Sequence, residues 1–77
     1  MRIYLLYDYD EDGPDSMFAT TDYEKLPALL VQLGYTDSET LETLHGALAD
    51  IRREIFRGPY GLTRGWGGAV LHMLDVE

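Results

Sequence analysis

RIYLLYDY, at residues 2–9, is the stretch that decides the fold. It is rich in aromatic and β-branched residues, and successive side chains of a strand point to opposite faces of a sheet. Alternation therefore sorts the stretch into two sets: Ile3, Leu5, Tyr7 and Tyr9 on one face, and Tyr4, Leu6 and Asp8 on the other. Because a strand that is apolar on both faces is typical of a sheet interior, we expect this strand to be central.

A hairpin is expected next in the chain. Residues 10–16, DEDGPDS, combine Gly13-Pro14 with four acids, which is typical of a turn. Residues 17–21 predict a short returning strand, so the hairpin has an acidic tip. Residues 69–76 alternate again and predict a third strand.

A first helix is indicated by leucines at helical spacing. Thr21 and Glu24 have the spacing of a capping box, and Gly34 stands where a C-terminal glycine is favoured. Pro27 lies too deep for a helix that starts at residue 22, so regular structure is expected from about Leu26. The apolar positions are Leu26, Leu29, Leu30 and Leu33.

A second, longer helix follows. Thr36 and Glu39 repeat the capping-box spacing, and Gly58-Pro59 is expected to end a helix of about twenty residues. The first turns carry Glu39 and Glu42, and the last carry arginines, as the helix dipole favours. The apolar stripe is Leu41, Leu44, Leu48, Ile51 and Ile55, and the arginines are Arg52, Arg53 and Arg57.

Residues 58–68 contain five glycines without a periodic pattern and are predicted to be a loop. The element order is then ββααβ. We expect one α+β domain over residues 1–77, with a three-stranded antiparallel sheet and two helices packed on one face. The uncovered face would expose Tyr4 and Leu6 or their counterparts, which makes it a candidate contact surface.

Composition excludes several classes. Without cysteine the chain has no disulfide framework, zinc knuckle or thiol nucleophile. Neither a signal peptide nor an apolar span is visible, which favours the cytoplasm. Two serines and two histidines come without a nucleophile motif, so we expect no enzyme and no cofactor.

Charge is the strongest global feature. Fourteen acids and six basic residues give a net charge of −8, and residues 1–42 hold ten of the acids with only two of the bases. Such a chain should avoid free nucleic acid and anionic membranes and favour a basic protein surface. The expected contact acids are Asp8, Asp10, Glu11, Asp12, Asp15, Glu24, Glu39 and Glu42.

Asp8, Asp10, Asp12 and Gly13 form D-x-D-x-D-G, which resembles the opening of an EF-hand calcium loop. Position twelve of such a loop falls on Ala19, where a bidentate Glu should stand. A solvated hairpin turn is the favoured interpretation, calcium binding is an alternative, and a dense anionic projection into a basic groove is a third.

Two aromatic residues stand in the glycine-rich segment. Tyr60 and Trp66 lie near Arg64, and large aromatics beside arginine are enriched at binding hot spots. The alternative is that both rings fold back to cap the core.

Small size, acidity, element order and the lack of a catalytic motif together resemble the small inhibitors of phages and mobile elements, including anti-CRISPR proteins and other DNA mimics. The resemblance implies a non-catalytic inhibitor that blocks a basic, nucleic-acid-handling surface of a larger protein. A calcium-binding module, or a small accessory protein that self-associates through its uncovered sheet face, is the alternative, and the chain is expected to be a monomer or a homodimer.

Overall fold

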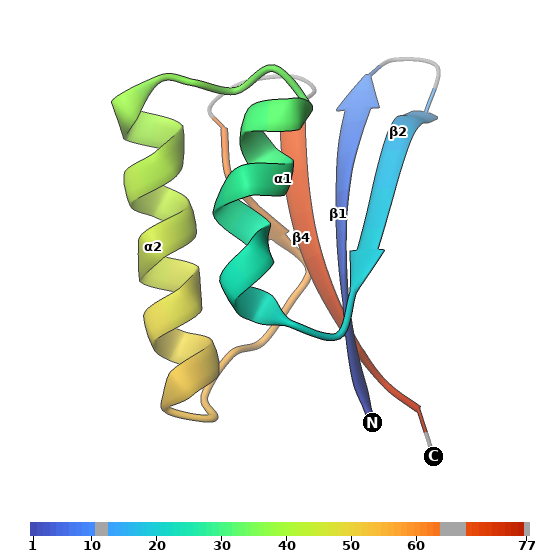
Figure 1. Ribbon diagram of the computed structural model, residues 1–77, viewed down its shortest axis with the longest axis vertical. Coiled ribbons are helices and arrows are strands. Elements are labelled where there is room, and N and C mark those ends of the chain that lie inside the picture. The colour runs from blue at the N-terminus through green and yellow to red at the C-terminus, as the bar shows by residue number, and fades with distance from the viewer. Residues whose placement is uncertain (11–12, 64–67, 77) are drawn as a thin grey trace.

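The computed structural model describes the backbone of residues 1–10, 13–63 and 68–76, and the side chains of residues 1–9, 16–63 and 68–76. An antiparallel sheet in the strand order β2-β1-β4-β3 is covered on one face by two helices (Figure 1). The α+β class is confirmed, but the sheet has four strands and not three. The elements in chain order are β1 (Arg2–Asp10), β2 (Gly13–Thr20), the 3-10 helix η1 (Tyr23–Lys25), α1 (Leu26–Gln32), α2 (Ser38–Arg52), β3 (Tyr60–Gly61) and β4 (Gly68–Asp75).

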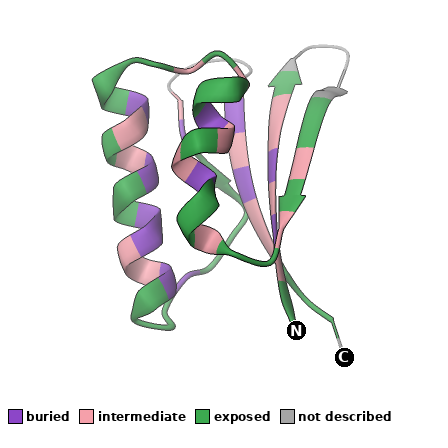
Figure 2. Cartoon of the chain, in the orientation of Figure 1, coloured by how far each residue is buried: buried purple, intermediate pink, exposed green. Residues whose placement is uncertain are grey.

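β1 is a central strand, as its two apolar faces predict. It pairs with β2 on one side and with β4 on the other. Tyr4 and Leu6 are buried, so the uncovered face carries their counterparts. Figure 2 shows buried positions on the strands and on the helices that cover them. We call this uncovered surface the open face; its described side chains from β1, β2 and β4 are Ile3, Leu5, Tyr7, Tyr9, Met17, Ala19, Val70, His72 and Leu74.

The core lies between the sheet and the two helices. Each of its fully buried leucines contributes about 1.5–3 kcal/mol through removal of apolar surface from water. No helix in the described part of the chain combines the length and apolar character that crossing a bilayer requires. The largest fully buried side chains are Leu6, Leu26, Leu30, Leu44, Leu48 and Leu71.

The returning strand is longer than expected. β2 begins at Gly13, within the segment predicted as a turn, and pairs with β1 up to Asp10. The register shifts where Asp8 faces Ser16 and Tyr9 faces Pro14, which is a β-bulge. Because β2 is an edge strand and the bulge takes up the irregularity, Pro14 is tolerated without an N–H.

The two N-cap residues predicted from the capping-box spacing, Thr21 and Thr36, are wrong. Asp22, and not Thr21, caps the 3-10 turn by accepting the N–H of Glu24 at 3.0 Å. Asp37, and not Thr36, caps α2. A carboxylate is the stronger acceptor at a helix N-terminus because it also meets the positive end of the dipole. Regular structure in α1 does begin at Leu26 as expected.

α2 is shorter than the predicted twenty residues. It has 15 residues and ends at Arg52, so Arg57 and Ile55 lie beyond it, and the Ile55 side chain is 53% exposed. Glu54 adopts a left-handed φ of 61°, and the N–H groups of Glu54 and Ile55 bond the carbonyls of Ile51 and Asp50. This is a Schellman ending built on a glutamate where a glycine is usual, so no glycine marks this helix end in the sequence.

The segment predicted as a loop contains β3. Tyr60 and Gly61 pair with Leu71 and Val70 of β4 and form the fourth strand. The flanking side chains Phe56 and Leu62 are each only 3% exposed. Phe56 and Leu62 are thus buried on either side of β3 and hold this short strand against β4. The sequence of the segment has no periodic pattern from which a strand could be predicted.

Candidate functional site

The N-terminus of α2 holds a carboxylate whose charge is fixed. The backbone N–H and the hydroxyl of Thr40 both donate to Asp37 Oδ2, at 2.9 and 2.6 Å. These hydrogen bonds lower the pKa of Asp37 below its usual value. Thr40 itself is buried, so the cap is anchored in the core. Asp37 is therefore a permanent negative charge at neutral pH.

A tyrosine joins the helical layer to the sheet beside this cap. The Tyr35 hydroxyl donates to Asp8 Oδ1 at 2.5 Å, and both side chains are half-buried. Desolvation, followed by the hydrogen bond to Asp8 and nearby carboxylate charge, raises the pKa of Tyr35 to about 12. Tyr35 is therefore a neutral donor, and Asp8 is held on the helix-covered face of β1.

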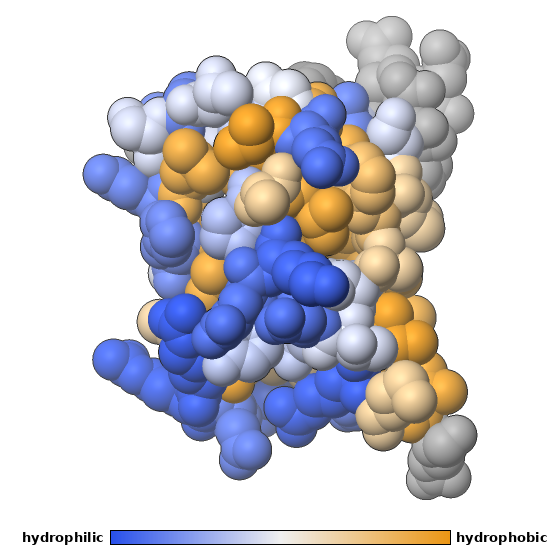
Figure 3. Space-filling view, in the orientation of Figure 1, coloured by the Kyte–Doolittle hydropathy of each residue, from blue (hydrophilic) through white to orange (hydrophobic). Residues whose placement is uncertain are grey.

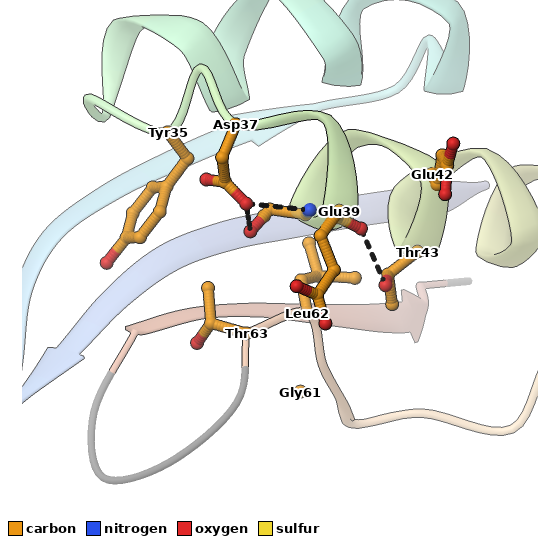
Figure 4. Close-up of a pocket in the computed structure, with 9 residues that line it drawn as sticks. Tyr35, Asp37, Glu39, Glu42, Thr43, Gly61, Leu62 and Thr63 are labelled. Carbon is orange, nitrogen blue, oxygen red and sulfur yellow. Dashed lines mark hydrogen bonds between the residues drawn. The ribbon is translucent and has the colours of Figure 1, made fainter.

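A half-open hollow of about 660 Å³ lies between the first turns of α2 and the residues around β3. It is lined by the acidic residues Asp37, Glu39 and Glu42, by threonines, and by Tyr35 and Leu62. In Figure 4 the Glu39 side chain extends toward Leu62 and Thr63, across the hollow.

This lining suits a cation. Carboxylates and hydroxyls can pair with the charged head of a lysine or arginine side chain, while its alkyl stem packs against the apolar part of the lining. Neither His45 nor His72 lines the hollow. Across the residues that are described, no group of three acids or histidines is placed to hold a metal ion.

β1 ends and α2 begins at the same end of the molecule (Figure 1), and acidic residues are frequent in the chain there. We call it the acidic end; among residues with a described backbone it contains Asp8, Asp10, Asp15, Asp37, Glu39 and Glu42. The opposite end has arginines and acids together, and we call it the mixed end. Its basic residues are Arg2, Lys25, Arg52, Arg53 and Arg57.

Two arginines of the mixed end have local partners. Arg2 pairs with Asp75 at 3.2 Å, and the Arg52 guanidinium lies 5.6 Å from the ring centre of Tyr23. Glu39 and Arg52 are about 20 Å apart along α2, more than two Debye lengths at physiological salt. The arginines of the long helix therefore do not cancel the charge of the acidic end.

Five of the ten expected contact residues fall at the acidic end. Glu39 and Glu42 border the hollow, and Asp8 is hydrogen-bonded beside it. Asp10 is paired at the end of β1, and Asp15 lies at the β-bulge of β2. Glu24, in η1, lies at the mixed end. The Tyr60 side chain is 42% exposed and its ring packs 5.6 Å from that of Phe56. Glu11, Asp12 and Trp66 lie outside the described residues.

Sequence reasoning missed Tyr35, Asp37 and Thr63 as members of the site. Asp37 could have been found, since an aspartate directly before a helical pattern is a capping signal. Nothing in the sequence links Tyr35 to Asp8, because their contact depends on how the helices sit on the sheet.

No known family, curated protein or solved structure matches the chain.

Proposed function

We propose that this chain is a non-catalytic binding protein whose acidic end occupies a basic surface of a larger, nucleic-acid-handling protein and thereby inhibits it. The observation that supports this function is that Glu39 and Glu42 lie in the first turns of α2, whereas the arginines of this helix and of the segment after it lie at the opposite end. A field concentrated at one end steers association and fixes the orientation of the bound molecule.

The hollow supplies a docking point within this field. A partner lysine or arginine that enters it meets Asp37, whose charge is held by its hydrogen bonds with Thr40, and Glu39 and Glu42. Because the cap is fixed before the partner arrives, little ordering entropy is lost on binding at this point.

Competition with nucleic acid follows from the same chemistry. A basic groove that binds phosphates recognises closely spaced negative charge, which the acidic end also presents. The chain would compete with DNA or RNA for that groove without binding nucleic acid itself, since its own net charge of −8 repels phosphates.

Two variants with equal net charge test where binding occurs. Glu39→Gln with Glu42→Gln neutralises the border of the hollow, and Asp50→Asn with Glu54→Gln removes two charges near the other end of the same helix. Exposed pairs contribute about 0.2–1 kcal/mol each, so the first variant should bind about fivefold more weakly and the second about as well as wild type.

The measurement is capture of bacterial lysate proteins on the immobilised chain at low and high salt, with duplex DNA as competitor. We expect captured proteins that high salt and DNA both displace and that the Glu39/Glu42 variant retains poorly. Equal capture by both variants, or capture that neither salt nor DNA changes, would remove the basis of this function.

A further inference from the structure

The open face, in the part whose side chains are described, is uncharged, whereas the chain as a whole has a net charge of −8. Its described side chains include no Asp, Glu, Lys or Arg, and apolar side chains lie along the strand side of the molecule in Figure 3. Three of them are large and well exposed: Met17 at 55%, Tyr9 at 47% and Leu74 at 40%. A contiguous apolar patch of this kind on a small domain is typical of an interface.

We propose that the open face binds the open face of a second copy of this chain, in a two-fold dimer whose facing strands run antiparallel. The proposal does not depend on the proposed function, because it uses the sheet and leaves the hollow and the helices free.

Charge sets the orientation. In a parallel pair the two acidic ends would lie side by side and repel each other. In the antiparallel pair each acidic end lies beside the mixed end of the other copy, where charges of both signs are present, so this repulsion is avoided. Like charges brought together across an interface cost free energy, which favours the antiparallel orientation.

Shape supports the same arrangement. On the open face, Tyr9 is paired with Gly68 at one end of the sheet and Ile3 with Leu74 at the other. With the two-fold axis near Leu6, Leu74 of each copy lies over the space left by Gly68 of the other. Met17, opposite Tyr7, likewise lies over Ala19, opposite Leu5. At these two pairs of positions a large side chain of one copy faces a small one of the other. The surface is complementary to itself there, as an isologous interface requires.

The area predicts a weak dimer. Three strands of eight residues cover about 26 by 14 Å, so two faces bury roughly 730 Å² in plan. Because side chains make each face uneven, the accessible surface buried is larger than this plan area and approaches the lower limit of about 1,200 Å² for stable interfaces. We therefore expect a reversible dimer with a dissociation constant in the range of about 1–100 μM.

Sedimentation equilibrium of the whole chain from about 1 to 500 μM tests the interface, with two lysine variants of equal charge. Met17→Lys places an ammonium group over Ala19 of the second copy, and we expect it to raise the dissociation constant at least tenfold. Val31→Lys, at a 47% exposed position on α1, should leave the constant unchanged. Circular dichroism establishes that both variants are folded. A wild-type chain that is monomeric throughout, or a dimer that both variants form equally well, overturns the proposal.

Cross-linking tests the orientation, and the absence of native cysteine makes it free of background. Ile3→Cys and Tyr9→Cys chains are mixed and treated with a short bismaleimide. The antiparallel dimer cross-links the two different variants to each other, whereas a parallel dimer cross-links each variant to itself. Predominant cross-linking of like variants overturns the antiparallel arrangement.

Discussion

Removal of the Tyr35 hydroxyl should weaken the fold without disturbing its core. Tyr35→Phe keeps the ring and deletes the only donor that this side chain offers to Asp8, at 2.5 Å. Asp8→Asn keeps an acceptor at the same position but removes the charge. The two substitutions and their combination form a double-mutant cycle on one contact between the sheet and the loop after α1.

The magnitude follows from the charge and burial of the pair. A hydrogen bond to an ionised group contributes about 1.5–3 kcal/mol, and the half-buried position favours the lower value of about 1.5 kcal/mol. A domain of this size has a free energy of unfolding of about 4–12 kcal/mol, so the loss is substantial. Converted for such a domain, Tyr35→Phe should lower the Tm by about 6–12 °C.

Alkaline pH should reveal the same contact. The folded-state pKa of Tyr35, about 12, lies above its ordinary value of 10.0, so the neutral side chain stabilises the fold. This stabilisation is complete below pH 10 and is lost as the pH rises from 10 toward 12. Urea unfolding at several pH values should therefore show a steeper loss in wild type than in Tyr35→Phe.

The refuting results are specific. If Tyr35→Phe melts with wild type and its effect adds to that of Asp8→Asn within about 0.5 kcal/mol, the two side chains do not interact. Parallel stability curves above pH 10 would likewise show that Tyr35 titrates with the same pKa when folded and unfolded.

Two backbone positions give further expectations, both measured by urea unfolding. Glu54→Gly should raise the free energy of unfolding by about 1 kcal/mol, because glycine adopts the left-handed φ of 61° without strain; an unchanged value would mean that the glutamate is not strained there. Gly68→Ala should lower it by about 2 kcal/mol, since φ is 118° and the new Cβ would lie 1.7 Å from Thr63 Oγ1. Gly46→Ala, in α2, is the control, because a Cβ added there would lie within 4 Å of no atom outside the local helix backbone. It should raise the free energy of unfolding by about 0.5–1 kcal/mol. Equal effects of the two alanines would contradict this account.

Patterns of period two and 3.6 predicted most of the fold. Alternation in residues 2–9 located the central strand and separated Tyr4 and Leu6 from the residues of the open face. Leucine spacing located both helices. These features depend on which side chains avoid water, and the spacing of apolar residues along a single element shows this directly.

Features that depend on one unusual residue or on distant contacts were not predictable. The end of α2 relies on a non-glycine residue in the left-handed region, and β3 forms because Phe56 and Leu62 are drawn into the core. For the candidate site, the charge imbalance along the chain singled out Glu39 and Glu42, and both line the hollow. The hollow itself needed the packing of α2 beside β3, which has no local signature.

The pairing of β1 with β4 has a consequence for how the chain folds. Arg2 faces Asp75, 73 positions away, so the sheet is completed only when nearly the whole chain has been ordered. Loop closure over such a separation slows folding relative to a helical bundle of equal size. Until β4 docks, one edge of the most apolar strand stays unpaired, and folding intermediates of this protein should aggregate through that edge at high concentration.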